Sequence, residues 1–143
     1  MKLVLFDLDD TLFDGDTEGE WVKFMDQNGF ITDNHFFDRM AVFTDSYRRG
    51  ELDVIEYSEF LLSPLKGKKL SELKESIKIF SADVVSRLTD DVTTKLLKRH
   101  TDDIKILTSG SLSFLVKDIA NHFGIEDSFG TVSYTHLTLP TTD

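Results

Sequence analysis

The stretch Leu3–Thr11, LVLFDLDDT, decides the fold that we expect for this chain. Residues 3–6 form a short continuous apolar run, which is typical of a strand buried on both faces of a parallel sheet. Asp7, Asp9 and Asp10 follow at once, where that strand should end. Open α/β sheets bind ligands at the carboxyl ends of their strands. The stretch therefore predicts a buried strand that ends at a ligand site.

The spacing of these aspartates indicates a metal ion. Residues two apart in a strand face the same side, so we expect Asp7 and Asp9 to lie together. Close carboxylates repel each other unless they share a cation, and Mg²⁺ is a hard cation that prefers oxygen ligands. Capping of the next turn would account for a single aspartate but not for an acidic cluster on an apolar strand. We therefore expect Asp7 and Asp9 to bind Mg²⁺.

A long helical segment follows the first strand. Residues 17–87 have the apolar spacing of helices, and a further helix should run from Asp90-Asp91 to His100. The expected helix ends within the segment are Asn28-Gly29, Gly50 and Ser63-Pro64. We interpret the aromatic residues of this segment, Tyr47 among them, as a helical core. The segment should sit above the carboxyl end of the first strand, because the chain leaves the sheet there.

The stretch Asp102–Ser111, DDIKILTSGS, predicts a second strand that ends in a small polar turn. A helix should follow, with apolar residues from Leu112 onward and a stop at Gly124. Hydroxyl and backbone N–H groups at the start of a helix form an anion site. Two parallel strands would bring Ser109 beside Asp7. A carboxylate nucleophile, a cation and an anion site at one edge suit phosphoryl transfer through an aspartyl-phosphate.

The composition limits the classes of partner. The chain has 143 residues, 40% hydrophobic and 29% charged, which is ordinary for one soluble domain or part of one. Its net charge of −10 argues against nucleic acid and anionic membranes as partners. The absence of cysteine excludes disulfides and thiolate metal sites. Since no apolar run approaches the ~18 residues of a membrane span, we expect a cytoplasmic protein, and the sequence does not indicate its oligomeric state.

The last twelve residues, VSYTHLTLPTTD, change character abruptly. A strand with a frayed terminus is one interpretation. VSYTHLTLPT also resembles the translation of the mosaic-end adapter used in transposon-based sequencing libraries. We therefore expect residues 132–143 to be a non-native, adapter-derived tail. On this hypothesis the authentic sequence here ends near Gly130 or Thr131, and the natural protein continues further.

Two motifs resemble those of the haloacid dehalogenase-like (HAD) hydrolases over about residues 2–131. FDLDDT is similar to their Asp-x-Asp-x-Thr first motif, and ILTSGS resembles their second motif. The run from Leu3 to Trp21 is most similar to subfamily IB, which includes phosphoserine phosphatases. The resemblance implies an α/β fold with a partial Rossmann-like parallel sheet core at residues 1–14 and 88–131. It also implies that residues 15–87 form a helical C1-type cap, inserted after the first strand.

The resemblance implies a role for each matching residue. Asp7 would attack phosphorus, and Asp9 would act as general acid and then as general base. The Asp7 carboxylate and the Asp9 backbone carbonyl would hold Mg²⁺. Thr11 would position Asp9, while Ser109 and the Gly110 amide would bind the phosphoryl oxygens.

The sequence also differs from the family pattern at several positions. Asp16 lies near the position of a substrate-contacting acid, although it could equally cap the helix that starts at Thr17. The cap arginine that holds the substrate carboxylate in phosphoserine phosphatases would fall on Glu59, which puts phosphoserine in doubt. The lysine of the third motif and the acidic pair of the fourth have no counterpart here, and a C-terminal truncation would account for both.

We therefore expect a Mg²⁺-dependent phosphomonoester hydrolase that acts on a small phosphorylated metabolite, with the 143-residue chain itself inactive. One alternative is a phosphotransferase of the same family, which product analysis with an added acceptor would distinguish. Another is a non-catalytic phosphate-binding protein. The presence of both Asp7 and Asp9 argues against that, because binding alone needs no general acid.

Overall fold

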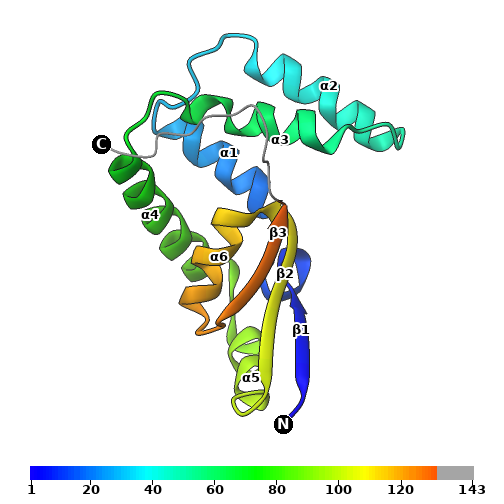
Figure 1. Ribbon diagram of the computed structural model, residues 1–143, viewed down its shortest axis with the longest axis vertical. Helices are drawn as coiled ribbons and strands as arrows, with labels where there is room; N and C mark the ends of the chain where they lie inside the picture. The colour runs from blue at the N-terminus through cyan, green and yellow to red at the C-terminus, as the bar shows by residue number, and fades with distance from the viewer. Residues whose placement is uncertain (132–143) are drawn as a thin grey trace.

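The computed structural model describes residues 1–131, which form an α/β fold around a parallel sheet (Figure 1). The strands lie in the order β1-β2-β3, with bounds β1 Leu3–Asp7, β2 Ile104–Leu112 and β3 Asp127–Thr131. Both pairs are parallel, as expected of strands joined through helices. The predicted fold class, a Rossmann-like parallel sheet with a helical segment inserted after the first strand, is confirmed. The third strand, β3, was not predicted from the sequence pattern.

The inserted segment consists of helices joined by loops. An irregular turn at Leu8–Leu12 precedes α1 Thr17–Gln27, which is followed by α2 Phe36–Arg48, α3 Val54–Leu62, a 3-10 turn at Ser63–Leu65 and α4 Leu70–Leu88. The chain returns to the sheet through α5 Asp91–Arg99, and α6 Ser113–His122 follows β2. The predicted helix stops are confirmed, since Gly29, Gly50 and Gly124 have φ of 74°, 70° and 69° just after α1, α2 and α6.

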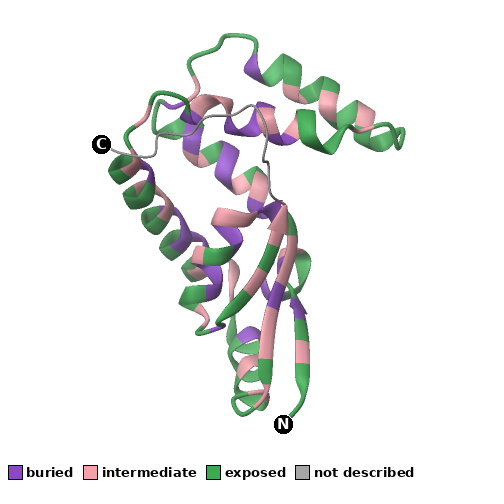
Figure 2. Cartoon of the chain, in the orientation of Figure 1, coloured by how far each residue is buried: buried purple, intermediate pink, exposed green. Residues whose placement is uncertain are grey.

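The sheet has one covered face and one open face. Phe6 pairs in register with Leu107, and both side chains are buried among the core residues, with Phe6 edge-on to the His100 ring at 5.6 Å. Side chains that point to the other face remain exposed, at 62% for Leu3, 64% for Leu5 and 64% for Phe129. Figure 2 shows the same alternation along the strands, whereas the helices beside the sheet turn their buried residues inward.

The insert is anchored to the sheet layer by an aromatic cluster. Trp21 of α1 is buried, and its ring contacts Phe80 of α4 at 5.1 Å and Phe114 of α6 at 6.1 Å. Further from the sheet, α2 and α3 pack together through the stacked rings of Phe36 and Phe60, 4.5 Å apart. Figure 1 shows α1, α2 and α3 beyond the carboxyl ends of the strands, where the sequence analysis expected the insert.

Three local predictions are wrong. The first strand was expected to be buried on both faces, but β1 lies at the edge of the sheet and its Leu3 and Leu5 side chains are exposed. Residues 109–111 were expected to open a helix directly, but β2 continues through Leu112 and α6 begins at Ser113. The strand is longer because its register shifts after Thr108 and Leu112 then pairs with Thr131 of β3. Tyr47 was assigned to the helical core, but 72% of it is exposed.

Two further statements, on the domain boundaries and on the C-terminal tail, are still predictions. The boundaries 1–14, 15–87 and 88–131 remain predictions, and the adapter-like tail, residues 132–143, lies outside the described residues. Within residues 1–131, each helix is too short or too polar to cross a bilayer.

Candidate active site

The register of the sheet places the two predicted motifs side by side. Asp7, the last residue of β1, pairs with Thr108 of β2, so Ser109 lies one residue beyond the same edge. The Ser109 hydroxyl donates to the Asp9 carboxylate, with 2.8 Å between Oγ and Oδ2. Ser109 was expected beside Asp7; in the structure Asp7 pairs with Thr108, and the direct contact of Ser109 is with Asp9.

The turn after β1 directs Asp9 back toward this edge. Asp7 caps the turn by accepting a hydrogen bond from the Leu8 amide at 3.0 Å. Asp9 keeps an extended backbone, with φ −69° and ψ 133°, and Asp10 then takes the left-handed φ of 57°. Asp10 therefore serves as the turn residue, and its amide donates to the Gly15 carbonyl at 3.1 Å to close the loop.

Both carboxylate oxygens of Asp9 accept hydrogen bonds. Oδ1 accepts from the Thr17 amide at 2.7 Å and from the Thr17 hydroxyl. Oδ2 accepts from the hydroxyls of Ser109 at 2.8 Å and Ser111 at 3.3 Å. All of these donors are neutral, so they orient the carboxylate without a fixed positive charge. A phosphoryl group at this edge would compete with Asp9 for the Ser109 hydroxyl.

Two of these donors were not predicted from the sequence. The resemblance implied that Thr11 positions Asp9, but Thr11 is exposed, whereas the fully buried Thr17 donates to Asp9 from both its amide and its hydroxyl. Nothing in the local spacing revealed Thr17, because the contact depends on how the turn folds back. Ser111 had a visible signal, since it lies two residues after Ser109 and faces the same side of β2.

Asp7 lies at the surface of this edge. Its carboxylate is exposed and accepts from the Leu8 amide. An exposed carboxylate and a backbone carbonyl are hard oxygen donors that fit Mg²⁺, which typically keeps several waters and takes one or two protein carboxylates plus substrate phosphate. Among residues 1–131, no three acidic or histidine side chains gather closely enough to form a metal site by themselves. The donors at this edge therefore fit a Mg²⁺ ion completed by other oxygens.

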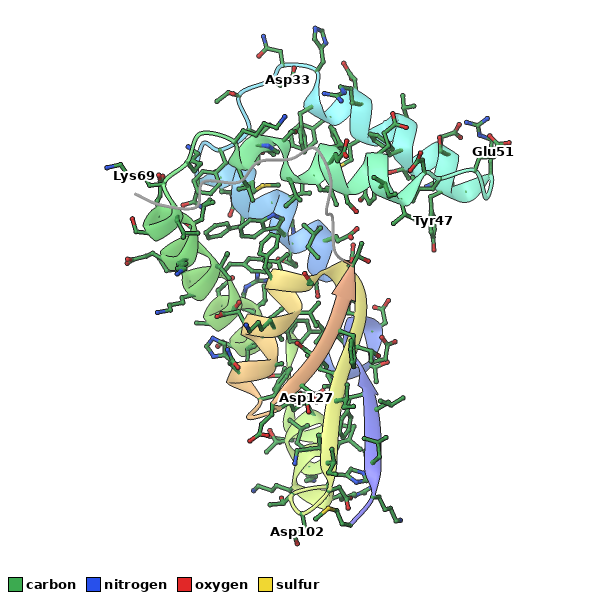
Figure 3. All side chains as sticks on the ribbon, viewed as in Figure 1. Asp33, Tyr47, Glu51, Lys69, Asp102 and Asp127 are labelled. Atoms are coloured by element: carbon green, nitrogen blue, oxygen red, sulfur yellow. The ribbon has the colours of Figure 1, made fainter. Side chains whose placement is uncertain are left out.

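A cavity of about 530 Å³ connects the sheet edge to the inserted helices. Asp9, Gly110 and Ser111 line its floor. The other described lining residues come mainly from α1, α2, α3 and the α2–α3 loop: Asp16, Glu18, Phe43, Thr44, Tyr47, Leu52, Val54, Tyr57, Ser58 and, from β3, Thr131. Asp7, Thr11 and Ser109 are not among them. Figure 3 shows Tyr47 extending from the end of α2 on the side nearer the sheet.

Asp16 and Glu18 bring two more carboxylates to the cavity. Asp16 caps α1 by accepting from the Gly19 amide at 3.1 Å, so the capping interpretation is confirmed. Its position in the cavity wall is also compatible with the alternative interpretation, contact with the substrate. Glu18, which the sequence analysis had missed, accepts from the Tyr57 hydroxyl at 3.1 Å. Burial raises the pKa of Glu18 to about 7; the Tyr57 hydrogen bond opposes this shift, and Asp16 and Asp9 add to it.

Known proteins are similar to this chain in sequence and fold. A histidinol-phosphatase from Neisseria meningitidis serogroup C (strain 8013) is 26% identical over 132 residues, which cover 91% of this chain and 60% of that protein. A solved protein of unknown function from Bordetella pertussis Tohama I has a TM-score of 0.78 and 27% identity, covering 92% of this chain and 61% of its own. A phosphoserine phosphohydrolase-like protein from Francisella tularensis subsp. tularensis SCHU S4 has the same fold, with a TM-score of 0.58, 20% identity and coverage of 91% and 58%.

The chain spans about three fifths of the length of these proteins. The family model for haloacid dehalogenase-like hydrolases matches residues 4–141, which include Asp7 and Ser109. The chain therefore belongs to the haloacid dehalogenase-like hydrolase family.

Proposed function

We propose that the protein hydrolyses small phosphomonoesters with Mg²⁺, through an aspartyl-phosphate on Asp7. One observation carries the proposal: the Asp9 carboxylate is fixed between Thr17 and Ser109, at the sheet edge where Asp7 is exposed. Membership of a hydrolase family and the similarity to a named histidinol-phosphatase support it.

Each reacting group has a place in this scheme. A carboxylate oxygen of Asp7 forms a bond to phosphorus while the bond from phosphorus to the ester oxygen breaks. Asp9, in its protonated form, gives its proton to the departing alkoxide. Asp9 then removes a proton from water, which attacks the phosphorus of the aspartyl-phosphate and releases phosphate and free Asp7. Ser109 and the Gly110 amide would bind the phosphoryl oxygens.

The Asp7 carboxylate and the Asp9 backbone carbonyl would hold the Mg²⁺ ion. When bound, the ion offsets the repulsion between the phosphoryl group and the aspartates. We further propose that the active form is the complete cytoplasmic protein, whose remaining two fifths would supply a lysine and an acidic pair to this edge.

The assay measures phosphate release by the protein expressed from its complete gene, with and without Mg²⁺. We expect Mg²⁺-dependent release by the natural sequence and by Asp26→Asn, an exposed control of the same charge change on α1. Asp7→Asn should release no phosphate above background, because an amide cannot replace the nucleophilic carboxylate. Activity retained by Asp7→Asn, or no activity in the natural sequence, would contradict the proposal. A product formed with an added alcohol would favour phosphate transfer instead.

A further inference from the structure

The cavity beside Asp9 has walls of one charge. Its described lining includes the carboxylates of Asp9, Asp16 and Glu18 and no lysine, arginine or histidine. A substrate that brought a second anionic group here would meet only negative charge. The phosphoryl end has Mg²⁺ and hydroxyl donors available in the proposed function, so this restriction applies to the other end of the substrate.

Aromatic rings complete the same wall. The Phe43 and Tyr57 rings lie 5.3 Å apart at an angle of 52°, and both line the cavity together with the exposed Tyr47. Aromatic faces attract cations, most strongly where water is partly excluded. An acid next to such rings forms a surface that suits a positively charged nitrogen.

Glu18 is the carboxylate of this wall that lies beside the aromatic rings. Asp9 accepts hydrogen bonds from Thr17, Ser109 and Ser111, and Asp16 caps α1. Glu18 accepts from the Tyr57 hydroxyl, which is neutral and holds the carboxylate beside the rings without cancelling its charge.

We propose that Glu18, together with Tyr57 and Phe43, binds a cationic nitrogen of the substrate, so that the enzyme selects phosphomonoesters of amines over neutral or carboxylated ones. This inference rests on the proposed function. Glu18 is here a specificity-determining residue that contacts the substrate away from phosphorus.

The electrostatics of Glu18 support this assignment. Burial, with Asp16 and Asp9 nearby, disfavours the ionised form of Glu18 and raises its pKa to about 7, even though the Tyr57 hydrogen bond favours ionisation. A bound cation would offset both the burial and the repulsion, and would therefore favour the ionised carboxylate. An anionic ligand would add to the repulsion.

The test is the relative kcat/KM of the complete protein for three phosphomonoesters of similar size. These are 2-aminoethyl phosphate, 2-hydroxyethyl phosphate and carboxymethyl phosphate, assayed at about pH 8, above the Glu18 pKa. We expect the amine to exceed the alcohol by about tenfold or more, as for loss of one charged contact, and the carboxylate to be the poorest. Glu18→Gln should reduce the amine-to-alcohol ratio to below about threefold. The matched control Glu75→Gln, at an exposed position on α4, should leave that ratio unchanged.

The outcomes separate the two proposals. Hydrolysis of all three esters without preference for the amine would overturn this inference and leave the phosphatase function standing. A preference for the amine ester that is unchanged in Glu18→Gln would also overturn this inference and leave the phosphatase function standing. If none of the three esters, nor a general substrate such as p-nitrophenyl phosphate, is hydrolysed, the phosphatase function itself fails. Should Glu18→Gln fold poorly by circular dichroism, Tyr57→Phe provides the second variant, and its amine-to-alcohol ratio should also fall.

Discussion

Thr17 connects the start of the first inserted helix to the chemistry of the sheet edge. Its amide and hydroxyl both donate to Asp9 Oδ1, and its side chain is fully buried. A residue that begins α1 thus also fixes the proposed acid/base. Any shift of the helix would move the carboxylate with it.

Replacement of Thr17 should separate positioning from chemistry. Thr17→Val keeps the shape of the side chain but removes its hydroxyl, so Asp9 Oδ1 loses one of the two hydrogen bonds that it accepts from Thr17. We expect kcat of the complete protein to fall about tenfold to a hundredfold, as for a misplaced catalytic group, and Thr17→Ser to recover most of it. Unchanged kcat in Thr17→Val, with the fold verified by circular dichroism, would show that the contact does not position Asp9.

Glu18 should make the folding stability depend on pH. Its pKa rises from 4.5 to about 7 on folding, so the folded state holds an extra proton between these pH values. The contribution of Glu18 to the free energy of unfolding is therefore fully present below pH ~4.5 and is lost as the pH rises through ~7. The decrease is at most about 3 kcal/mol, and solvent around this half-buried carboxyl reduces it. In urea unfolding, Glu18→Gln should flatten this slope, and an equal slope in both proteins would contradict the assignment.

At this scale, the sequence predicted residue types better than their contacts. Asp7, Asp9 and Ser109 were predicted together because strand register follows from the pattern of apolar runs. Thr17 and Glu18 could not be predicted in the same way. Their contacts depend on how the turn at Leu8–Leu12 and the packing of α3 orient the start of α1.

Among the elements, β2 and β3 meet at a point where only glycine fits. A Cβ built on Gly130 would lie 2.7 Å from the Ser113 Cα and 2.8 Å from the Ser111 carbonyl oxygen. Both atoms belong to the backbone and cannot easily move aside. Gly130 thus allows β3 to approach the junction of β2 and α6 that carries Ser111.

Substitution at this contact should be destabilising. Gly130→Ala is expected to lower the free energy of unfolding by about 1–3 kcal/mol because the methyl group overpacks the junction. Gly110→Ala serves as the control, since a Cβ there meets nothing within 4 Å, and its stability should change by less than about 0.5 kcal/mol. Urea unfolding of the two variants measures the difference. Equal stabilities would contradict a close backbone approach at Gly130.

Element ends were the most predictable part of the fold. Gly29, Gly50 and Gly124 stop helices where the sequence indicated, because their positive φ favours glycine. The end of β2 was not predictable from the Thr-Ser-Gly-Ser run. That strand is extended by its pairing with β3, a contact between distant parts of the chain that local pattern does not encode.

At the scale of the whole molecule, the sheet of residues 1–131 has one face whose apolar side chains are exposed among the described residues. Leu3, Leu5, Ile104 and Phe129 are each about half exposed or more, at 62%, 64%, 49% and 64%. Parallel sheets are normally covered on both faces. Among the described residues, the helices beside the sheet pack on the other face. The alternation of side chains along the strands directs these residues to this face, and none of the described helices covers it.

The open face should bind hydrophobic dyes and promote association of the 143-residue chain. We expect the double variant Leu5→Lys and Phe129→Lys to lower both the fluorescence of the dye ANS and the light scattering. Ile79→Lys, at a comparably exposed apolar position on α4 (57%), is the control and should change neither. The expectation fails if the double variant binds as much dye as the unmodified chain, or if the control lowers dye binding equally.

The proposed chemistry predicts a transient covalent phosphate on Asp7. The complete protein, mixed with a phosphomonoester labelled with ³²P and quenched in acid within milliseconds, should carry label that is stable to acid and released by hydroxylamine. Peptide mapping should place that label on Asp7, and Asp7→Asn should carry none. Label on Ser109, or full phosphate release without any labelled protein, would contradict an aspartyl-phosphate on Asp7.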